Sequence, residues 1–235
     1  LGEKPLLADD AEQLKTLTAS TRTRGVTCYT AYNHRFEPHV IRLREVLEKG
    51  VLGRVYLVKM YYGNGTARDV RQSPWRDQGM GVLADLGSHL LDLVGLLCGR
   101  PTSRFELWGC YRFENEAADH VVFGSRGSPA IELEASFVSW RNTFTIDVYG
   151  ELGSAHLQGL CKWGLSTFTL RTRIFPSGKP REEVQSLTGP DPTWVLEYQH
   201  FKQLCAQGGT TLENDGWINM VLQALFDEAH MSVPT

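Results

Sequence analysis

A series of β-prone segments between residues 103 and 187 constrains the fold more than any other feature of the sequence. The connections between these segments are short, and those at 125–129 and 176–180 carry turn signals. Antiparallel neighbours can be joined by short turns, whereas parallel neighbours need a crossover of a dozen or more residues. We therefore expect one large, mostly antiparallel sheet. Its segments fall at 104–113, 118–124, 130–138, 141–149, 155–158, 163–175 and 181–187.

Helical patterns lie on both sides of this series. A first helix ends at Arg24 before Gly25, and a second begins at Pro38, a favoured first helical residue. Short β-prone runs fall at 26–30 and 55–62, and a polar loop is expected over 63–80. The further helices are expected at about 79–98, 193–206 and 215–231. The order of elements predicts an α+β fold with the helices on one face of the sheet.

Composition narrows the class of protein. The chain has 235 residues, 42% of them hydrophobic and 22% charged, as in globular proteins. A net charge of −3 gives no electrostatic case for binding nucleic acid or an anionic membrane. No apolar run reaches the roughly 18 residues of a membrane-spanning helix. The five cysteines are odd in number and show no C-x-x-C spacing, which favours reduced thiols in a cytoplasmic protein over disulfides or a zinc site.

The expected helix at 79–98 carries the strongest candidate for chemistry. Asp85, His89 and Asp92 stand at i, i+4 and i+7, opposite a leucine-rich face. A carboxylate one turn from an imidazole can orient the ring and tune its pKa, so the pair suits proton transfer. Two other interpretations stay open: a metal site built from these three residues, and a solvated polar face.

Two glycine-rich segments are formally similar to dinucleotide-binding loops. Residues 79–84 match G-x-G-x-x-A, but no apolar strand precedes them. Residues 63–68 follow a β-prone run but lack the third small residue. The sequence therefore shows no complete dinucleotide-binding fold.

Several short motifs together resemble one family, the glucose–fructose oxidoreductase, inositol dehydrogenase and rhizopine-catabolism (Gfo/Idh/MocA) family of nicotinamide-dependent oxidoreductases. The resemblance runs in order along essentially the whole chain. It rests on Glu3-Lys4-Pro5, Tyr32-Asn33-His34-Arg35-Phe36-Glu37-Pro38, Gly50-Val51-Leu52-Gly53-Arg54-Val55, Trp75-Arg76, the G-x-L-x-D-x-G-x-H-x-x-D pattern from Gly81 to Asp92, Tyr198 with Phe201, and Asn214-Asp215-Gly216.

The resemblance implies a role for each matching residue. Lys4, Asp85 and His89 would be catalytic: His89 the general acid and base on the substrate oxygen, Lys4 the group that stabilises a developing alkoxide, and Asp85 a contact to the substrate or to the imidazole. No metal is expected. The implied cofactor contacts are Glu3, Lys4, Pro5, Trp75 and Arg76, and the candidate substrate contacts are Asn33, Arg35, Asp85 and His89.

The resemblance also implies how the chain is organised. Residues 1–30 would be the C-terminal remnant of a Rossmann dinucleotide-binding domain, and residues 31–235 an α+β domain for substrate binding and dimerisation. The cofactor of the complete site would be NAD or NADP. Because the family's nucleotide-binding half precedes E-K-P, we expect either a fragment of a longer protein, which we favour, or a gene that encodes a truncated relative. In both cases we expect the chain to be inactive by itself.

The leading hypothesis is the catalytic and substrate-binding portion of an NAD(P)-dependent oxidoreductase that acts on a sugar, polyol or related hydroxyl carbon. The alternatives are a non-catalytic ligand-binding or regulatory module on the same fold, and a metal-dependent lyase or hydrolase that uses Asp85, His89 and Asp92.

The expected partners are a carbohydrate-like small molecule and a second copy of the chain, with no nucleic acid and no membrane. Helices on one face leave the other face of the sheet open, which predicts a homodimer or higher homo-oligomer. The residues taken as evidence for an apolar open face are Phe137, Val138, Trp140, Phe144, Ile146, Val148 and Tyr149.

Overall fold

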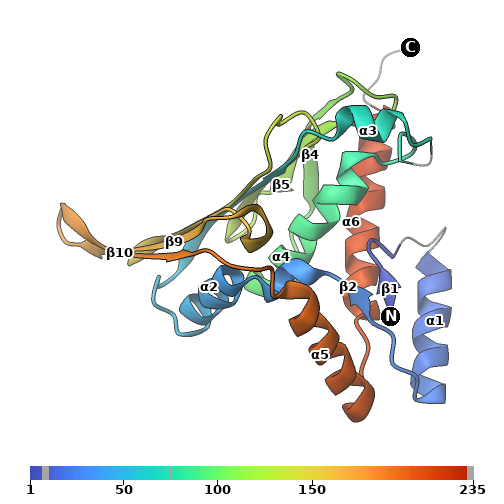
Figure 1. Cartoon of the computed structure of the whole chain (residues 1–235), viewed down its shortest axis with the longest axis horizontal. Helices are drawn as coiled ribbons and strands as arrows, with labels where there is room; N and C mark the ends of the chain where they lie inside the picture. Colours follow the sequence, from blue (N-terminus) through green and yellow to red (C-terminus); the bar gives the residue numbers. More distant parts are fainter. Residues whose placement is uncertain (7–10, 75, 232–235) are drawn as a thin grey trace.

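An eight-stranded sheet runs through the computed structural model, which describes residues 1–6, 11–74 and 76–231 (Figure 1). The strands lie in the order β10-β9-β8-β7-β3-β6-β5-β4, and only β3 and β6 are parallel neighbours within this sheet. The mostly antiparallel sheet is therefore confirmed. Its strands are β3 (Val55–Gly63), β4 (Phe105–Tyr111), β5 (His120–Ser125), β6 (Ala130–Ser136), β7 (Thr143–Gly150), β8 (Gly153–Gln158), β9 (Ser166–Ile174) and β10 (Gly178–Leu187).

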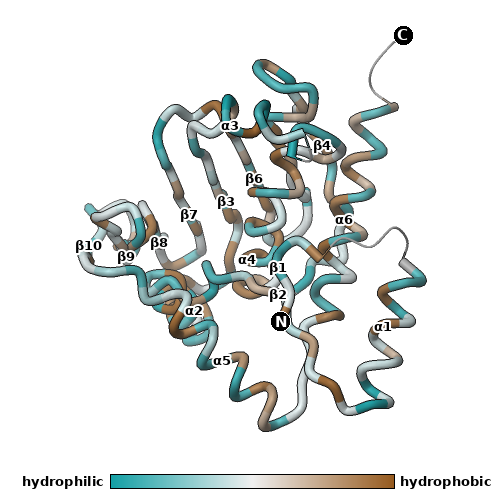
Figure 2. The backbone as a smooth tube through the Cα atoms, turned by 45° about the vertical axis from the view of Figure 1, so that its right-hand side comes forward, coloured by the Kyte–Doolittle hydropathy of each residue, from teal (hydrophilic) through white to brown (hydrophobic). Residues whose placement is uncertain are grey.

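The helices that pack on this sheet lie on one face of it, as expected. The helices of the described residues are α1 (Ala11–Arg24), α2 (Pro38–Glu48), α3 (Ala67–Arg71), α4 (Ser88–Cys98), α5 (Thr193–Gln207) and α6 (Leu212–Met231). Helix α2 packs on β8 and β9, α4 on β3, and α6 on β4. Figure 2 shows hydrophobic residues concentrated along the central strands and α4, where this core lies.

Alternation along the strands sorts residues between the two faces. On β6, Ile131 and Leu133 are fully buried under the helices, whereas Glu132 and Glu134 point to the open face and are half-exposed. A one-residue shift in register would put these carboxylates into the core, so the sequence pattern fixes the pairing.

A small βαβ unit forms the N-terminal edge of the molecule. Strand β1 (Gly2–Glu3) pairs in parallel with β2 (Thr30–Ala31), and α1 lies between them in sequence and packs against α6. A parallel pair linked through a helix is the building unit of dinucleotide-binding folds. Strand β1 of this unit ends at Glu3, directly before Lys4.

Two local expectations were wrong. The expected loop at 63–80 contains the short helix α3, which buries Ala67 and Val70. The apolar residues taken as evidence for an open face lie mostly in the core: Phe137, Phe144 and Ile146 are covered by the helices. Successive side chains along a strand point to opposite faces of the sheet, so every second residue faces the core. Apolar content alone therefore did not identify the exposed face.

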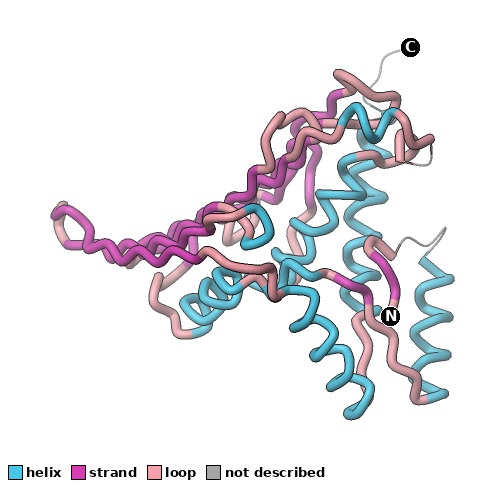
Figure 3. Tube along the Cα trace, in the orientation of Figure 1, coloured by secondary structure: helices cyan, strands magenta, loops and turns pink. Residues whose placement is uncertain are grey.

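Strands β9 and β10 extend beyond the helices as a hairpin (Figure 3). Every residue of β10 is exposed, as are the last four residues of β9. Pairing between the two strands holds this arm together, with Arg171 and Glu182 joined at 2.6 Å.

Candidate active site

Two histidine rings stack beside the central strand of the sheet. His89 is the second residue of α4, and His34 lies in the 3₁₀ helix η1 (Asn33–Phe36). Their centroids are 4.2 Å apart and their planes differ by 25°. The ring of Tyr62, near the end of β3, lies 5.2 Å from that of His34 and 5.8 Å from that of His89. Three elements distant in sequence thus meet at His89.

Both imidazoles are held neutral. Burial lowers the pKa of His89 well below its usual value, and the nearby His34, Lys4 and Lys162 lower it further. Burial likewise lowers the pKa of His34, with Lys162 and Lys4 adding to the shift. A neutral imidazole has a free lone pair, so His89 is in the form that accepts a proton.

Lys4 joins the site from the end of β1. Its Nζ donates to Asp85 Oδ1 at 2.5 Å and to the Asp85 carbonyl at 2.6 Å. Arg76 donates to the second carboxylate oxygen of Asp85 at 3.1 Å. Asp85 therefore fixes two cations in the site.

The carboxylate of Asp85 stays ionised. Burial alone would raise its pKa, but Lys4 and Arg76 outweigh that effect and hold the pKa below its usual range. No residue that the structure describes donates a hydrogen bond to His89 or accepts one from it, and the Nδ1 atom of His89 is buried. Asp85 thus positions Lys4, whereas the sequence pattern had also allowed it to orient the imidazole.

A π-helical turn explains this difference. Asp85 lies in the turn η2 (Leu83–Gly87), which leads directly into α4. The wider winding of a π turn breaks the 100° spacing that would place i, i+4 and i+7 on one face. Asp92, with 1% exposure, binds Arg35 and Asn214, whereas Asp85 binds Lys4 and Arg76. The two carboxylates therefore serve different partners, and neither is hydrogen-bonded to His89 among the described residues.

The partners of these residues also bear on the interpretation of Asp85, His89 and Asp92 as a metal site. No group of three histidine, cysteine or carboxylate residues is gathered for a metal ion within the described part of the chain. Asp92 is already paired with the guanidinium of Arg35, its Nε at 2.7 Å. The three residues therefore do not form a ligand set.

Asn33 and Arg35 are turned toward internal partners. Asn33 is buried and donates to the Thr193 hydroxyl at 3.0 Å. Arg35 forms a two-bond pair with Asp92. Bidentate pairs of this kind fix local geometry, so these positions favour a structural role over the expected substrate contact.

The remaining expected cofactor contacts are spread around Lys4. Glu3 is exposed at the end of β1, and Pro5 is half-buried after Lys4. Arg76 reaches the site through Asp85. Trp75 lies outside the described residues.

Lys162 is a site residue that sequence reasoning did not single out. It lies in the 3₁₀ helix η3 (Cys161–Trp163), between β8 and β9. Its Nζ is 3.4 Å from His34 Nε2 and 5.2 Å from the centre of the Trp163 ring. Nothing in the local pattern links this loop to residue 34, because the approach is created by the packing of η1 against the sheet.

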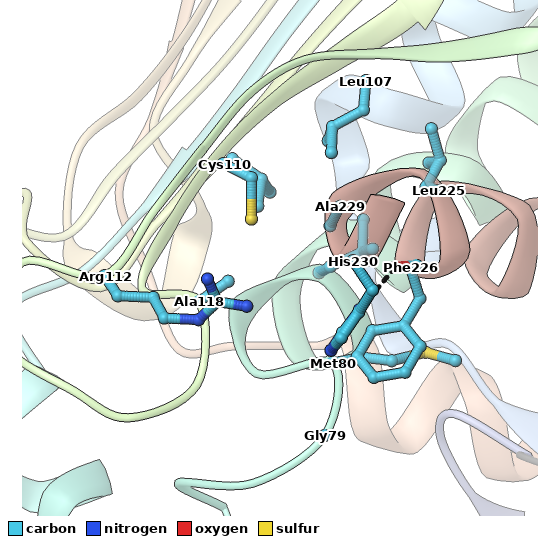
Figure 4. A pocket seen from close by; sticks show the side chains of 12 residues that line it. Gly79, Met80, Leu107, Cys110, Arg112, Ala118, Leu225, Phe226, Ala229 and His230 are labelled. Atoms are coloured by element: carbon cyan, nitrogen blue, oxygen red, sulfur yellow. Dashed lines mark hydrogen bonds between the residues drawn. The ribbon is translucent and has the colours of Figure 1, made fainter. Parts of the chain in front are cut away.

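The cavity drawn in Figure 4 lies elsewhere, between α6 and the strands β4 and β5. Its lining includes Met80, Cys110 and His230 but none of Lys4, His34, Asp85, His89 or Lys162. Its free volume of about 10 Å³ is the size of one water molecule. It is too small for a sugar, so the candidate site is defined by the side-chain cluster instead.

Comparison with known proteins identifies the family. Residues 40–156 match the model of the GFO/IDH/MocA C-terminal domain. Trans-1,2-dihydrobenzene-1,2-diol dehydrogenase from Bos taurus is 34% identical over 168 residues, or 68% of this chain and 48% of the bovine protein. The chain belongs to the Gfo/Idh/MocA family. The recognition made from sequence motifs is thereby confirmed.

Further relatives agree with this assignment. The Mus musculus enzyme of the same name is 31% identical over 221 residues, which cover 88% of this chain and 62% of the mouse protein. These matches span only about half to three fifths of the relatives' length. The structure of levoglucosan dehydrogenase in complex with NADH and L-sorbose superimposes with a TM-score of 0.81 at 19% identity, over 97% of this chain and 70% of that one. This likeness shows the Gfo/Idh/MocA fold.

No helix among the described residues is long and apolar enough to cross a membrane.

Proposed function

We propose that this chain is the substrate-binding and catalytic part of an NAD(P)-dependent oxidoreductase that acts on a hydroxyl carbon of a sugar, polyol or diol. The observation that carries the proposal is the ammonium of Lys4, held by Asp85 next to a buried, neutral His89. The names of the relatives support it, because the family members matched are dehydrogenases.

The described residues fit the reactive end of such a cofactor. Lys4 directly follows β1, the first strand of the parallel βαβ unit, as a residue at the edge of a dinucleotide-binding unit would. Neither glycine-rich segment serves as a phosphate cradle: residues 79–84 follow a loop, and Gly65 lies against Trp140, whose Cα would be 3.1 Å from an added Cβ. NAD(P), when bound, supplies the hydride acceptor or donor.

Each protein group then has a defined task. His89 takes the hydroxyl proton as the C–H bond gives up its hydride and C–O becomes C=O; in reduction it returns the proton. Because Nδ1 is enclosed, Nε2 is the ring nitrogen left to meet a substrate. Lys4 stabilises the negative charge that develops on the substrate oxygen, and Asp85 keeps the ammonium in place.

Replacement of His89 tests this function. In the full-length gene product, His89→Ala should lower kcat for NAD(P)⁺-dependent oxidation of a sugar and polyol panel by about 100-fold or more, the usual contribution of a general base. The control is His230→Ala, on the exposed side of α6, which should leave kcat unchanged. A His89→Ala rate within tenfold of the wild type would contradict the mechanism. Tight sugar binding without any redox activity would favour the non-catalytic, regulatory alternative.

We also propose that the chain comprises parts of two domains, residues 1–30 and residues 31–235. The βαβ unit at residues 1–30 supports a remnant of a dinucleotide-binding domain, and residues 31–235 hold the sheet and the imidazole pair.

A further inference from the structure

The positive charge of the candidate site exceeds what its own carboxylate neutralises. Lys4 and Arg76 share the single carboxylate of Asp85. Lys162 forms no ion pair with any residue that the structure describes, and its closest polar neighbour is His34, which is neutral. Three cations thus surround the imidazoles with one carboxylate in direct contact.

Two further carboxyl groups, Glu37 and Asp191, act on Lys162 through their charge, but neither forms an ion pair with it. Glu37 lies beneath η3, where its Oε2 accepts the backbone N–H of Cys161 at 3.1 Å. It is 2% exposed, and burial raises its pKa. The ammonium of Lys162 is therefore left without a carboxylate in direct contact.

Lys162 is accessible to a ligand, whereas His34, which lies against it, is enclosed. Its residue is exposed to solvent, while His34 is 1% exposed. The half-buried ring of Trp163, backed by the buried ring of Tyr62 at 5.9 Å, lies next to Lys162 and is suited to the C–H face of a sugar. Desolvation lowers the pKa of Lys162, Glu37 and Asp191 offset part of that shift, and the charge of Lys4 adds to it. A bound anion would relieve both effects.

We propose that this site takes a substrate bearing a carboxylate, an acidic sugar or a sugar-derived hydroxy acid, and that Lys162 binds that carboxylate while His89 faces the reacting hydroxyl. The inference rests on the proposed function, because both concern the same site. A single lysine is a point charge suited to a monoanion, whereas phosphate recognition favours several donors or a guanidinium fork.

Two pairs of probes that differ by one carboxylate test the proposal. The pairs are D-glucose with D-glucuronate and D-glucitol with D-gluconate, titrated into the chain by calorimetry at low ionic strength. The acid of at least one pair should bind at least tenfold more tightly than its neutral partner. The preference should shrink as salt is added, because exposed charges are screened.

Matched lysine variants locate the effect. Lys162→Gln should reduce the preference for the acid at least fivefold and leave the affinity for the neutral partner within twofold. Lys179→Gln, in the exposed strand β10, should keep the full preference. Equal affinity for acid and neutral probes, or a preference that survives in Lys162→Gln, overturns the inference while the sugar site stands. If none of the four probes binds, both this inference and the proposed substrate class fail.

Discussion

Glu197 lies on α5 with 4% of its surface exposed, and Tyr29 donates a hydrogen bond to it at 3.1 Å. Burial raises the pKa of Glu197 to about 7, and Tyr29 offsets only part of that rise. Asp215, at the start of α6, is in a similar position: burial raises its pKa to about 6. Both carboxyl groups therefore keep their protons to a higher pH than an exposed carboxyl group would.

Glu197 should make stability depend on pH. The folded chain binds this proton more tightly than the unfolded chain, so the contribution of Glu197 to stability is fully present below about pH 4.5 and is lost as the pH rises to about 7. The shift corresponds to about 3 kcal/mol over the whole window. In Glu197→Gln this loss should be absent, because the amide cannot ionise and still accepts the hydroxyl of Tyr29.

Chemical denaturation at a series of pH values measures the difference. Exposed Glu116 provides the control, since Glu116→Gln should follow the wild type throughout. If the curves of Glu197→Gln and the wild type stay parallel from pH 4.5 to 8, the assignment to Glu197 is wrong.

At this scale the sequence was informative only where a motif exists. Lys4, Asp85, Arg76 and His89 stand in motifs, and the structure gathers them within hydrogen-bond or charge contact. Lys162 has no local signal, because its approach to His34 depends on a loop between two late strands. Asn33 and Arg35 follow a strand as ligand contacts often do, yet the packing of α5 and α4 gives them internal partners.

Among the elements, the π turn η2 sets the site geometry, and Gly81 allows the chain to enter it. Gly81 has φ +52°, and a Cβ there would meet the Ala118 carbonyl oxygen at 2.3 Å. The same carbonyl accepts the N–H of Val82 at 2.8 Å, so the backbone cannot move aside cheaply. The turn is thereby anchored to the segment before β5.

Gly81→Ala should therefore destabilise the chain strongly. Positive φ alone costs about 1–2 kcal/mol for a residue with a Cβ, and the clash adds to it. Gly79→Ala is a matched control, because Gly79 has φ +58° but an added Cβ would meet nothing within 4 Å. Urea denaturation should show a loss at least about 2 kcal/mol larger for Gly81→Ala. Equal losses for the two variants would show that the contact with Ala118 does not matter.

Apart from α3, the main element types and their order followed from the sequence, whereas helix winding did not. Hydrophobic alternation and short connections specify the antiparallel strands, and glycines mark the ends of α1 and α4. A π turn, by contrast, keeps the same residue types as an α-helix, and the chain enters it next to Ala118, which lies far along the chain. The separate partners of Asp85 and Asp92 were accordingly not predicted.

For the whole molecule, the open face of the sheet remains the predicted surface for a second copy. Its charges are largely paired among themselves: Lys59 with Glu132 at 2.6 Å, and His156 with Asp147 at 2.6 Å. Paired charges are cheaper to bury than isolated ones. Tyr149, 39% exposed on β7, lies next to this row.

We expect a dimer at micromolar concentration by light scattering. Tyr149→Lys should shift the mass toward that of the monomer, because it places an unpaired charge on the central strands. Tyr198→Lys, at an exposed tyrosine on α5, should not. A monomer for the wild type would refute the prediction.

The parallel pairing of β3 with β6 has a consequence for how the chain acquires its structure. On one side β3 meets a strand that begins at Ala130, and on the other a strand that begins at Thr143. During synthesis β3 therefore has neither of its neighbouring strands until β6 and β7 have been synthesised. The hairpins β4–β5–β6 and β7–β8–β9–β10 need only local turns and can form early. Insertion of β3 between them closes long loops, so we infer that it limits the folding rate and leaves an apolar strand open to misassociation until it is complete.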